Sequence, residues 1–448
     1  MSPDSRSRPN VVLILPHDLG ATLGCLGSGA HTPHADRLAR EGVLVEGLYA
    51  AGVLASPSRA SLLTGCYPHT HRLLGPLPEG WLLDADRCPP LGRLLAGAGY
   101  DAHLFGFQHE HVHAAALGYA HAHALPSYHA EDVAAVFETW LAGRDGSARP
   151  FYAVLSPWEA HRLSLSPSHY RRDAYTPPDP ATVDLPAWLP DLPATREDWA
   201  GYLGAVEHAD RLVGRVLAAL QARGALDDTL VILTTDAGPS AMHAKATLYD
   251  GGTHLAWAMR WPGRLPAGGR VGGLASQVDI LPTVLDLLNL PIPPTAEGQS
   301  LRAALEGGGP APRQAVFAER NYDPHLQPAR MARTLRWKYT RRAAAHCIYD
   351  EVIQELELSA GNFRESRPMF AFYAARRVTE ELYDLQADPA ELHNLAEDPA
   401  YAGPLAEMRA LLDAHLAATS DPFSEVRLAT PADPDAYVKV RANPRAQA

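Results

Sequence analysis

NVVLILPHD, residues 10–18, starts as a short apolar run and ends in polar residues. The run is rich in β-branched side chains, a pattern that predicts a buried strand. His17 and Asp18 follow it directly, so their side chains emerge at the carboxyl end of that strand. In open α/β sheets ligands bind at this edge. The stretch therefore predicts both a sheet and the place of a binding site.

Strand and helix patterns alternate outward from this stretch. Further strands are predicted over 43–49, 101–107, 151–157, 229–236 and 254–263, and helices over 32–42, 57–65, 91–100, 199–224 and 279–290. Such alternation is typical of an α/β fold, in which helices sandwich a large, mostly parallel sheet. After about residue 291, turn-rich linkers lead into short strands and a final helix. We expect an α/β domain over 1–305 and a smaller α+β domain with a short antiparallel sheet over 306–448.

Composition limits the classes of function. The 448 residues are 46% hydrophobic and 20% charged, as in a globular protein too long for one ordinary core. A net charge of −12 without a basic run argues against a nucleic-acid partner. The four cysteines share no metal-ligand spacing and are expected to be ordinary thiols.

The sequence also bears on location. The first apolar run is too short for a signal peptide, and no apolar run reaches the roughly 18 residues of a membrane span. We therefore expect a cytoplasmic protein with no membrane partner. The oligomeric state stays open, a homodimer included.

Polar residues follow three of the predicted strands. His17 and Asp18 end the first, Asp236 ends the strand that starts at 229, and His109 comes just after 101–107. The two carboxylates suit Ca²⁺ or Mg²⁺, whereas an imidazole at position 17 favours softer ions such as Zn²⁺ or Mn²⁺. The alternative is that both aspartates only stabilise the turns after their strands. Both interpretations stay open at this point.

SPSRASLLTG, residues 56–65, predicts a turn that enters a short helix. Arg59 falls in the first turn of that helix, beside backbone N–H groups that favour anions. Arginine binds oxyanions through its planar fork, although a surface arginine paired with an acid would show the same pattern. Lys245 and His161 follow strands, and each taken singly is expected to be a loop residue.

Nine segments in order, from about residue 9 to 430, resemble the formylglycine-dependent sulfatases of the alkaline-phosphatase superfamily. They include NVVLILPHDLG, SPSRASLLTG, TLVILTTDAG and ELYDLQADPAELHNL. The TPH start, the Q-H-E of 108–110 and the R-T-x-R-W-K-Y of 333–339 are most similar to the sulfamidase, or heparan N-sulfatase, branch. The resemblance implies the family's fold, hydrolysis of a sulfuric ester or sulfamate, and a small anionic or sulfated ligand.

The resemblance also implies roles for individual residues. In that family a cysteine in C-x-P-S-R becomes formylglycine, whose hydrate attacks sulfur, while Ca²⁺ and several cations hold the anion. By position, the resemblance gives catalytic roles to Arg59, His109, His161 and Lys245. It gives metal-binding roles to His17, Asp18 and Asp236.

Four positions depart from the family pattern. Ala55 replaces the cysteine, His17 the first aspartate of a pair, Phe107 a lysine, and Ala237 an asparagine or histidine. An engineered, substrate-trapping Cys→Ala change would leave the metal ligands alone. We therefore favour a natural chain that has lost formylglycine chemistry. Its Ca²⁺ affinity should be weakened, and a protonated His17 would pair with one of the acids.

Three interpretations follow. The first is an impaired sulfatase that still binds an anion. The second is an active, metal-dependent sulfate or phosphate ester hydrolase that uses His17, Asp18 and Asp236. The third is a partner-binding pseudoenzyme whose pocket is vestigial.

Ser56 lies one residue along a tight turn and is expected to point elsewhere. The histidine-rich run 109–124 is expected to be solvated surface, and loops such as 160–198 and 340–375 to set specificity.

Overall fold

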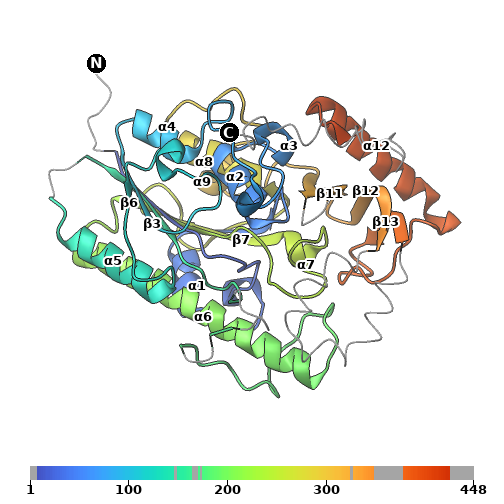
Figure 1. Ribbon diagram of the computed structural model, residues 1–448, viewed down its shortest axis with the longest axis horizontal. Coiled ribbons are helices and arrows are strands. Elements are labelled where there is room, and N and C mark those ends of the chain that lie inside the picture. The colour runs from blue at the N-terminus through green and yellow to red at the C-terminus, as the bar shows by residue number, and fades with distance from the viewer. Residues whose placement is uncertain are drawn as a thin grey trace.

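The opening strand, β1 (Asn10–Ile14), lies inside a nine-stranded sheet (Figure 1). The computed structural model describes residues 8–145, 149–163, 170, 171, 174–322, 326–347 and 377–423. The other strands of this sheet are β2 (Val43–Tyr49), β3 (Asp101–Gly106), β4 (His121–Ala122), β5 (Phe151–Ser156), β6 (Thr229–Thr234), β7 (His254–Arg260), β8 (Gly269–Val271) and β9 (Ala275–Ser276).

The strand order is β4-β3-β5-β1-β6-β7-β2-β8, with β9 also beside β2. β7 runs antiparallel to its neighbours β6 and β2, and the remaining pairs are parallel. The sheet is therefore mixed but mostly parallel, as the alternation of patterns predicts.

Helices cover both faces of the sheet (Figure 1). They are α1 (Pro33–Glu41), α2 (Ala55–Thr64), α3 (Pro68–His71), α4 (Leu91–Gly97), α5 (Ala130–Ala142), α6 (Pro193–Ala222), α7 (Asp250–Thr253), α8 (Ile280–Leu287) and α9 (Arg302–Gly307). Short 3-10 turns lie at Gly24–Leu26, Leu77–Glu79, Ala114–Leu117, Gln277–Asp279 and Pro399–Tyr401.

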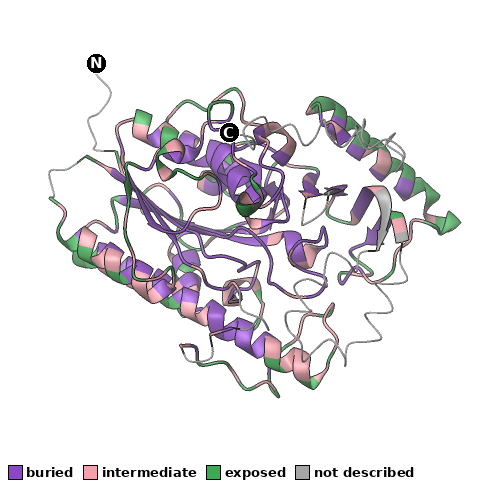
Figure 2. Cartoon of the chain, viewed as in Figure 1, coloured by how far each residue is buried: buried purple, intermediate pink, exposed green. Residues whose placement is uncertain are grey.

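The two faces of β1 belong to two different cores. Val11 and Leu13 pack with residues of α2, α4 and α8. Val12 and Ile14 pack with residues of α1, α5 and α6 on the other face. Because alternate side chains of a strand point to opposite faces, a strand covered on both needs an unbroken apolar run. Figure 2 shows the consequence: the sheet is buried, and α5 and α6, which cover one of its faces, are exposed mainly on their outer sides.

A second, antiparallel sheet follows in the chain. Its strands are β10 (Val316–Tyr322), β11 (Leu326–Arg333), β12 (Trp337–Cys347) and β13 (Arg377–Asp384). The last helix of the described residues, α12 (Ala402–Ala418), covers it with one apolar stripe that contains Leu405, Met408, Leu412 and Leu416. The expected fold class, a sandwiched sheet plus a small antiparallel α+β part, is confirmed, whereas the division at residue 305 stays a prediction.

Some boundaries differ from those predicted. α2 begins at Ala55, two residues before the predicted start, because a proline in the first turn needs no N–H partner. α6 begins at Pro193, six residues early, for the same reason. α5 and β11 were not predicted. Among the described helices, none combines the length and the apolarity that crossing a bilayer needs.

Candidate functional site

The carboxyl ends of β1 and β6 bring three of the predicted site residues together. The two strands pair in parallel, with Ile14 opposite Leu233, so His17 and Asp18 leave the sheet beside Asp236. The backbone N–H of Asp18 donates to Oδ1 of Asp236 over 3.0 Å. All three side chains are buried. The predicted gathering of His17, Asp18 and Asp236 at this edge is therefore present.

The imidazole of His17 lies between the two carboxylates. Its Nδ1 is 2.9 Å from Oδ1 of Asp18 and 3.2 Å from Oδ2 of Asp236. Burial alone would lower the pKa of His17, but the charges of Asp236 and Asp18 raise it. Burial conversely favours a neutral Asp236, yet the charge of His17 lowers the pKa of that carboxyl. A buried ion pair is therefore formed, and it involves both acids where one was expected.

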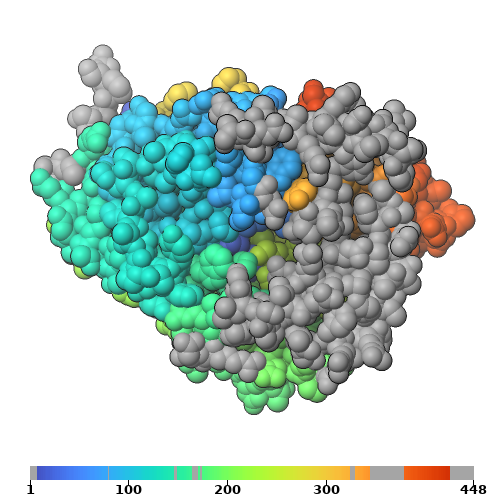
Figure 3. All heavy atoms as spheres, viewed as in Figure 1, coloured from blue at the N-terminus to red at the C-terminus, as the bar shows by residue number. Residues whose placement is uncertain are grey.

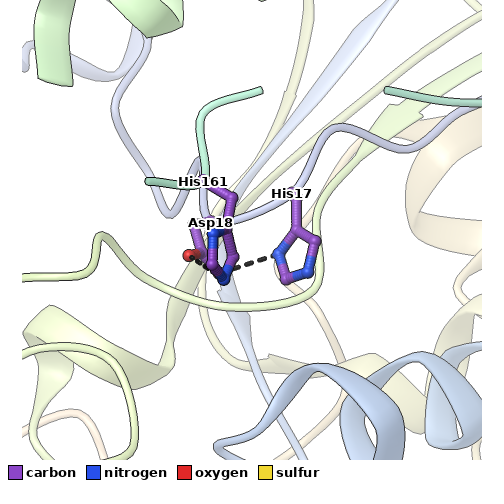
Figure 4. Close-up of side chains that lie close together, drawn as sticks. All are labelled: His17, Asp18 and His161. Atoms are coloured by element: carbon purple, nitrogen blue, oxygen red, sulfur yellow. Dashed lines mark hydrogen bonds and ion pairs between the residues drawn. The ribbon is translucent and has the colours of Figure 1, made fainter. Parts of the chain in front are cut away.

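The second oxygen of Asp18 has its own set of donors. Oδ2 accepts a hydrogen bond from Oγ of Ser240 over 2.9 Å and from Nζ of Lys245 over 2.7 Å. Nε2 of His161 is 3.8 Å from the same oxygen. Burial works against ionisation, but the charges of Lys245 and His17 hold the pKa of Asp18 well below its usual range. Figure 4 shows His17 and His161 beside Asp18. The ring centroids of the two histidines are 4.6 Å apart.

Arg59 lies in the first turns of α2, the helix that begins at Ala55. Its Nε donates to Oε1 of Glu110 over 2.6 Å, and Nη1 is 3.8 Å from Oδ2 of Asp236. No side chain caps the start of this helix. Glu110, which also accepts from the backbone N–H of His109 over 2.8 Å, was missed as a site residue. The Q-H-E segment was a signal for it, but only as part of the family resemblance.

The four positions that depart from the family pattern lie at or beside this buried cluster of charged side chains. They are His17, Ala55, Phe107 and Ala237. The ring of Phe107 stacks on His17 at 5.2 Å and lies 5.0 Å from Cζ of Arg59. Ala237 is fully buried and Ala55 is partly exposed. The ring of His109 is 4.7 Å from that of Phe107, and its burial lowers its pKa to about 2, so it is neutral at pH 7.

Ser56 does not replace the missing nucleophile. Its side chain is buried, and its Oγ accepts a hydrogen bond from the backbone N–H of Leu77 over 3.1 Å. This contact holds the hydroxyl against the segment that follows α3, as expected for a residue one step along the turn.

The residues do not fit the Ca²⁺ that the fold family implies. Ca²⁺ takes about six to eight oxygen ligands. Here the two carboxylates of Asp18 and Asp236 face the imidazole of His17, the ammonium of Lys245 and the guanidinium of Arg59. The methyl group of Ala55 likewise offers no atom from which formylglycine could form. One nitrogen-containing set is close enough for a softer ion, since His17, Asp18 and His161 offer ligand atoms within 4.8 Å of one another.

Three buried polar atoms at this centre make no hydrogen bond with any described residue. They are Nε2 of His17, Nη1 of Arg59 and Oδ2 of Asp236, although that oxygen lies within ion-pair distance of Nδ1 of His17 and of Nη1 of Arg59. More than nine in ten buried polar groups in native structures have such a partner. Three exceptions in one place indicate a centre that accommodates a further polar group. The segments 160–198 and 340–375, which were predicted to set specificity, lie partly outside the described residues.

Comparisons with known proteins agree with this architecture. Residues 9–290 match the family described as Sulfatase. Human N-sulphoglucosamine sulphohydrolase is 30% identical over 337 residues, which are 67% of this chain and 67% of that protein. Human arylsulfatase A is 28% identical over 435 residues, 86% of this chain and 82% of that relative.

Solved structures share the fold. The phosphonate monoester hydrolase of Agrobacterium radiobacter superposes with a TM-score of 0.70 at 24% identity, over 92% of this chain and 96% of that one. A protein in complex with its substrate D-glucosamine-2-N,6-O-disulfate gives a TM-score of 0.70 at 19% identity, over 93% and 99% of the two chains. The matched family segment contains β1, α2 and β6, which carry the buried centre, and this chain belongs to the sulfatase family.

Proposed function

We propose that this chain binds a small sulfated or otherwise anionic ligand at its sulfatase centre and has lost formylglycine chemistry. One observation carries the proposal. Arg59 is buried at the uncapped start of α2, and its Nη1 has no hydrogen-bond partner among the described residues. A guanidinium beside a helix N-terminus is suited to an oxyanion.

The loss of catalysis rests on the residues around Arg59. Ala55 provides no nucleophile, and Ser56 is held by Leu77. Phe107 supplies a ring where the resemblance leads us to expect an amine. The centre therefore keeps groups that hold a charge and lacks the group that attacks.

The charge balance predicts a modest affinity. The centre contains three carboxylates, which face the cationic side chains of Arg59 and Lys245. They also face His17, whose pKa is raised. The positive and negative charges therefore largely cancel. An incoming anion would be held by N–H donors and by the helix terminus, with no large net positive charge to attract it. The partly exposed His161 and Lys245, whose side chains are 17% and 8% exposed, form the entry side.

Sulfated glucosamine is the ligand class to test first. The relative at 30% identity is an N-sulphoglucosamine sulphohydrolase, and one structural neighbour was solved with a glucosamine that carries two sulfate groups. Both support a sulfated amino sugar.

Calorimetry of the full chain with D-glucosamine-2-N,6-O-disulfate tests the proposal. We expect saturable binding that Arg59→Ala weakens about tenfold or more, since a hydrogen bond to a charged group contributes about 1.5–3 kcal/mol. Arg40→Ala, which removes an exposed arginine from α1, is the matched control and should bind normally. Equal binding by both variants, or metal-independent turnover of the sugar by the unmodified chain, would contradict the proposal.

A second candidate is a metal-dependent sulfate or phosphate ester hydrolase. It is favoured by the proximity of His17, Asp18 and His161, whose ligand atoms lie within 4.8 Å of one another. In that case Zn²⁺ or Mn²⁺ would support hydrolysis, and Asp236→Ala would abolish it. The absence of any ligand-dependent shift in melting temperature would instead leave a partner-binding pseudoenzyme.

A further inference from the structure

A cluster of histidines lies at the edge of the large sheet, formed by β3 and β4. The two strands run parallel, with His103 opposite His121. Because alternate residues of a strand share a face, Asp101 and His103 of β3 lie on the same side. His123 follows β4 two residues after His121 and donates its backbone N–H to the carbonyl oxygen of Leu104. The histidine-rich run 109–124 was expected to be solvated surface; of its last two histidines, His121 is exposed as expected and His123 is only partly exposed, and both join this cluster.

The ligand atoms of the cluster are already close together. Nε2 of His103 is 3.0 Å from Oδ2 of Asp101, and Nε2 of His121 is 3.5 Å from Oδ1 of the same carboxylate. In a tetrahedral zinc site with bonds of about 2.0–2.1 Å, ligand atoms stand about 3.3 Å apart. The two observed separations, which involve the two different oxygens of Asp101, lie on either side of that value. The ligand atoms of the three residues all lie within 4.8 Å of one another.

The ring nitrogen Nε2 of His103 is buried without a hydrogen bond in the described part of the chain, which is unusual for a polar atom. The side chain of His103 is only 4% exposed, and Nε2 makes no hydrogen bond of acceptable geometry with any described residue. The other ring nitrogen, Nδ1, is 3.0 Å from Nε2 of His123. When that contact holds the Nδ1 proton, the lone pair of Nε2 points at the carboxylate of Asp101. A ligating histidine is commonly oriented in this way through its second nitrogen.

Two side chains contact the cluster from outside, Trp140 and Arg144. The ring of His103 is also fixed by Trp140 of α5, with centroids 4.5 Å apart. The cationic side chain of Arg144 competes with a metal ion for the carboxylate of Asp101. Its Nη1 is 2.9 Å from Oδ2 of Asp101, the oxygen that Nε2 of His103 also approaches, whereas Oδ1 faces His121.

We propose that Asp101, His103 and His121 bind a divalent transition-metal ion of the Zn²⁺ class, with His123 as the positioning residue. Two imidazoles and one carboxylate are a ligand set that suits zinc, with water in the fourth position because His121 is 56% exposed. The ion would fasten the two-residue strand β4 to the sheet. It would thereby anchor the far end of the segment that begins with Phe107 and His109. Figure 3 shows that the chain around residues 100–140 reaches the surface on this face.

The test uses the full chain, stripped with a chelator and then titrated with Zn²⁺, with bound metal measured by atomic emission. We expect His121→Ala and Asp101→Asn each to lose one equivalent of tightly bound zinc. His123→Ala should weaken that equivalent about 10–100-fold, the usual effect of removing an orienting partner. His113→Ala removes an exposed histidine of the same run and is the matched control, with zinc binding unchanged.

Comparing each variant with the unmodified chain separates this site from any ion at His17 and Asp18, which the substitutions leave intact. Co²⁺ in place of Zn²⁺ gives a second readout, because its visible absorption reports nitrogen ligands. His121→Ala should lose that band while its melting temperature without metal stays unchanged. Failure of the unmodified chain to bind zinc at micromolar concentration would overturn the proposal. Equal zinc binding by the unmodified chain, His121→Ala and Asp101→Asn would also overturn it.

Discussion

Nε of Arg59 lies 2.6 Å from Oε1 of Glu110, and both side chains are buried. The contact joins the first turns of α2 to the segment after β3. It thereby connects the start of α2 to the segment that contains Phe107 and His109. The Arg59 guanidinium is held in place by this carboxylate.

Glu110→Gln should destabilise the protein markedly. Removing one partner of a buried ion pair leaves an uncompensated charge, which costs about 3–5 kcal/mol. Urea unfolding measures this cost. Asp86→Asn is the control, since it breaks the exposed pair with Arg93 and should leave the free energy of unfolding unchanged within error. A Glu110→Gln protein as stable as the control would mean that the buried pair contributes nothing.

His17→Asp should create a dependence on Ca²⁺. The substitution replaces the cation between Asp18 and Asp236 by a third carboxylate, and three acids in one buried place repel one another. We expect the melting temperature to fall without Ca²⁺ and to recover when Ca²⁺ is added, because a ligand that binds the folded state stabilises it. The unmodified chain should show no such shift, and His113→Asp controls for the added charge. Recovery with added NaCl alone would indicate simple screening.

Ala55→Cys alone should not confer sulfatase activity. The thiol, even when converted to formylglycine, would lack the amine that the family resemblance implies at position 107, where this chain has Phe107, and a cation site formed by oxygen ligands. We expect arylsulfate hydrolysis to stay at background, while the combination with His17→Asp, Phe107→Lys and Ala237→Asn raises it. The matched comparison is the same triple change on an Ala55 background. Full activity of Ala55→Cys by itself would show that the other three positions are not impaired.

Stability should fall between about pH 6.5 and pH 9. Burial by itself lowers the pKa of His69, but the charges of Glu319 and Asp421 raise it to about 9. A group whose folded pKa is raised contributes its full stability below its unfolded value and loses that contribution as the pH rises through the folded pKa. At 1.36 kcal/mol per unit of pKa, the loss is on the order of 3 kcal/mol.

Urea unfolding at pH 6.5, 8 and 9.5 checks this slope. His69→Gln should flatten it, because Nδ1 of His69, which lies 2.5 Å from Oε1 of Glu319, would no longer carry the proton. His393→Gln changes a side chain that is 80% exposed and should keep the slope of the unmodified chain. A His69→Gln protein with the original slope would assign the effect to another group.

The fold could be predicted where burial leaves a local pattern. β1 and β2 are apolar runs because both of their faces are covered, and α6 is long and amphipathic. β11 could not be recognised, because its buried arginines Arg330 and Arg333 resemble a surface strand. Their acidic partners, Asp421 and Asp250, lie far away in the sequence. A charge neutralised by distant residues leaves no periodic signal.

The site shows the same limit. His17, Asp18 and Asp236 could be predicted because each directly follows a strand at one sheet edge. Ser240 could not, since a serine in a loop has no pattern, yet it donates to Oδ2 of Asp18. The residues that complete a buried network are selected by the geometry of the fold, and the local sequence carries little trace of them.

The central place of β1 also governs the order in which the molecule can assemble. Val11 pairs with Tyr152 on one side and with Leu230 on the other. During synthesis β1 can pair with β5 and β6 only after those strands have been made much later. One of its edges stays unpaired until β6 has been made. Such long-range parallel pairing folds slowly and exposes apolar edges to aggregation. Chains that end before residue 229 should accordingly be insoluble, because β1 then lacks its second neighbour.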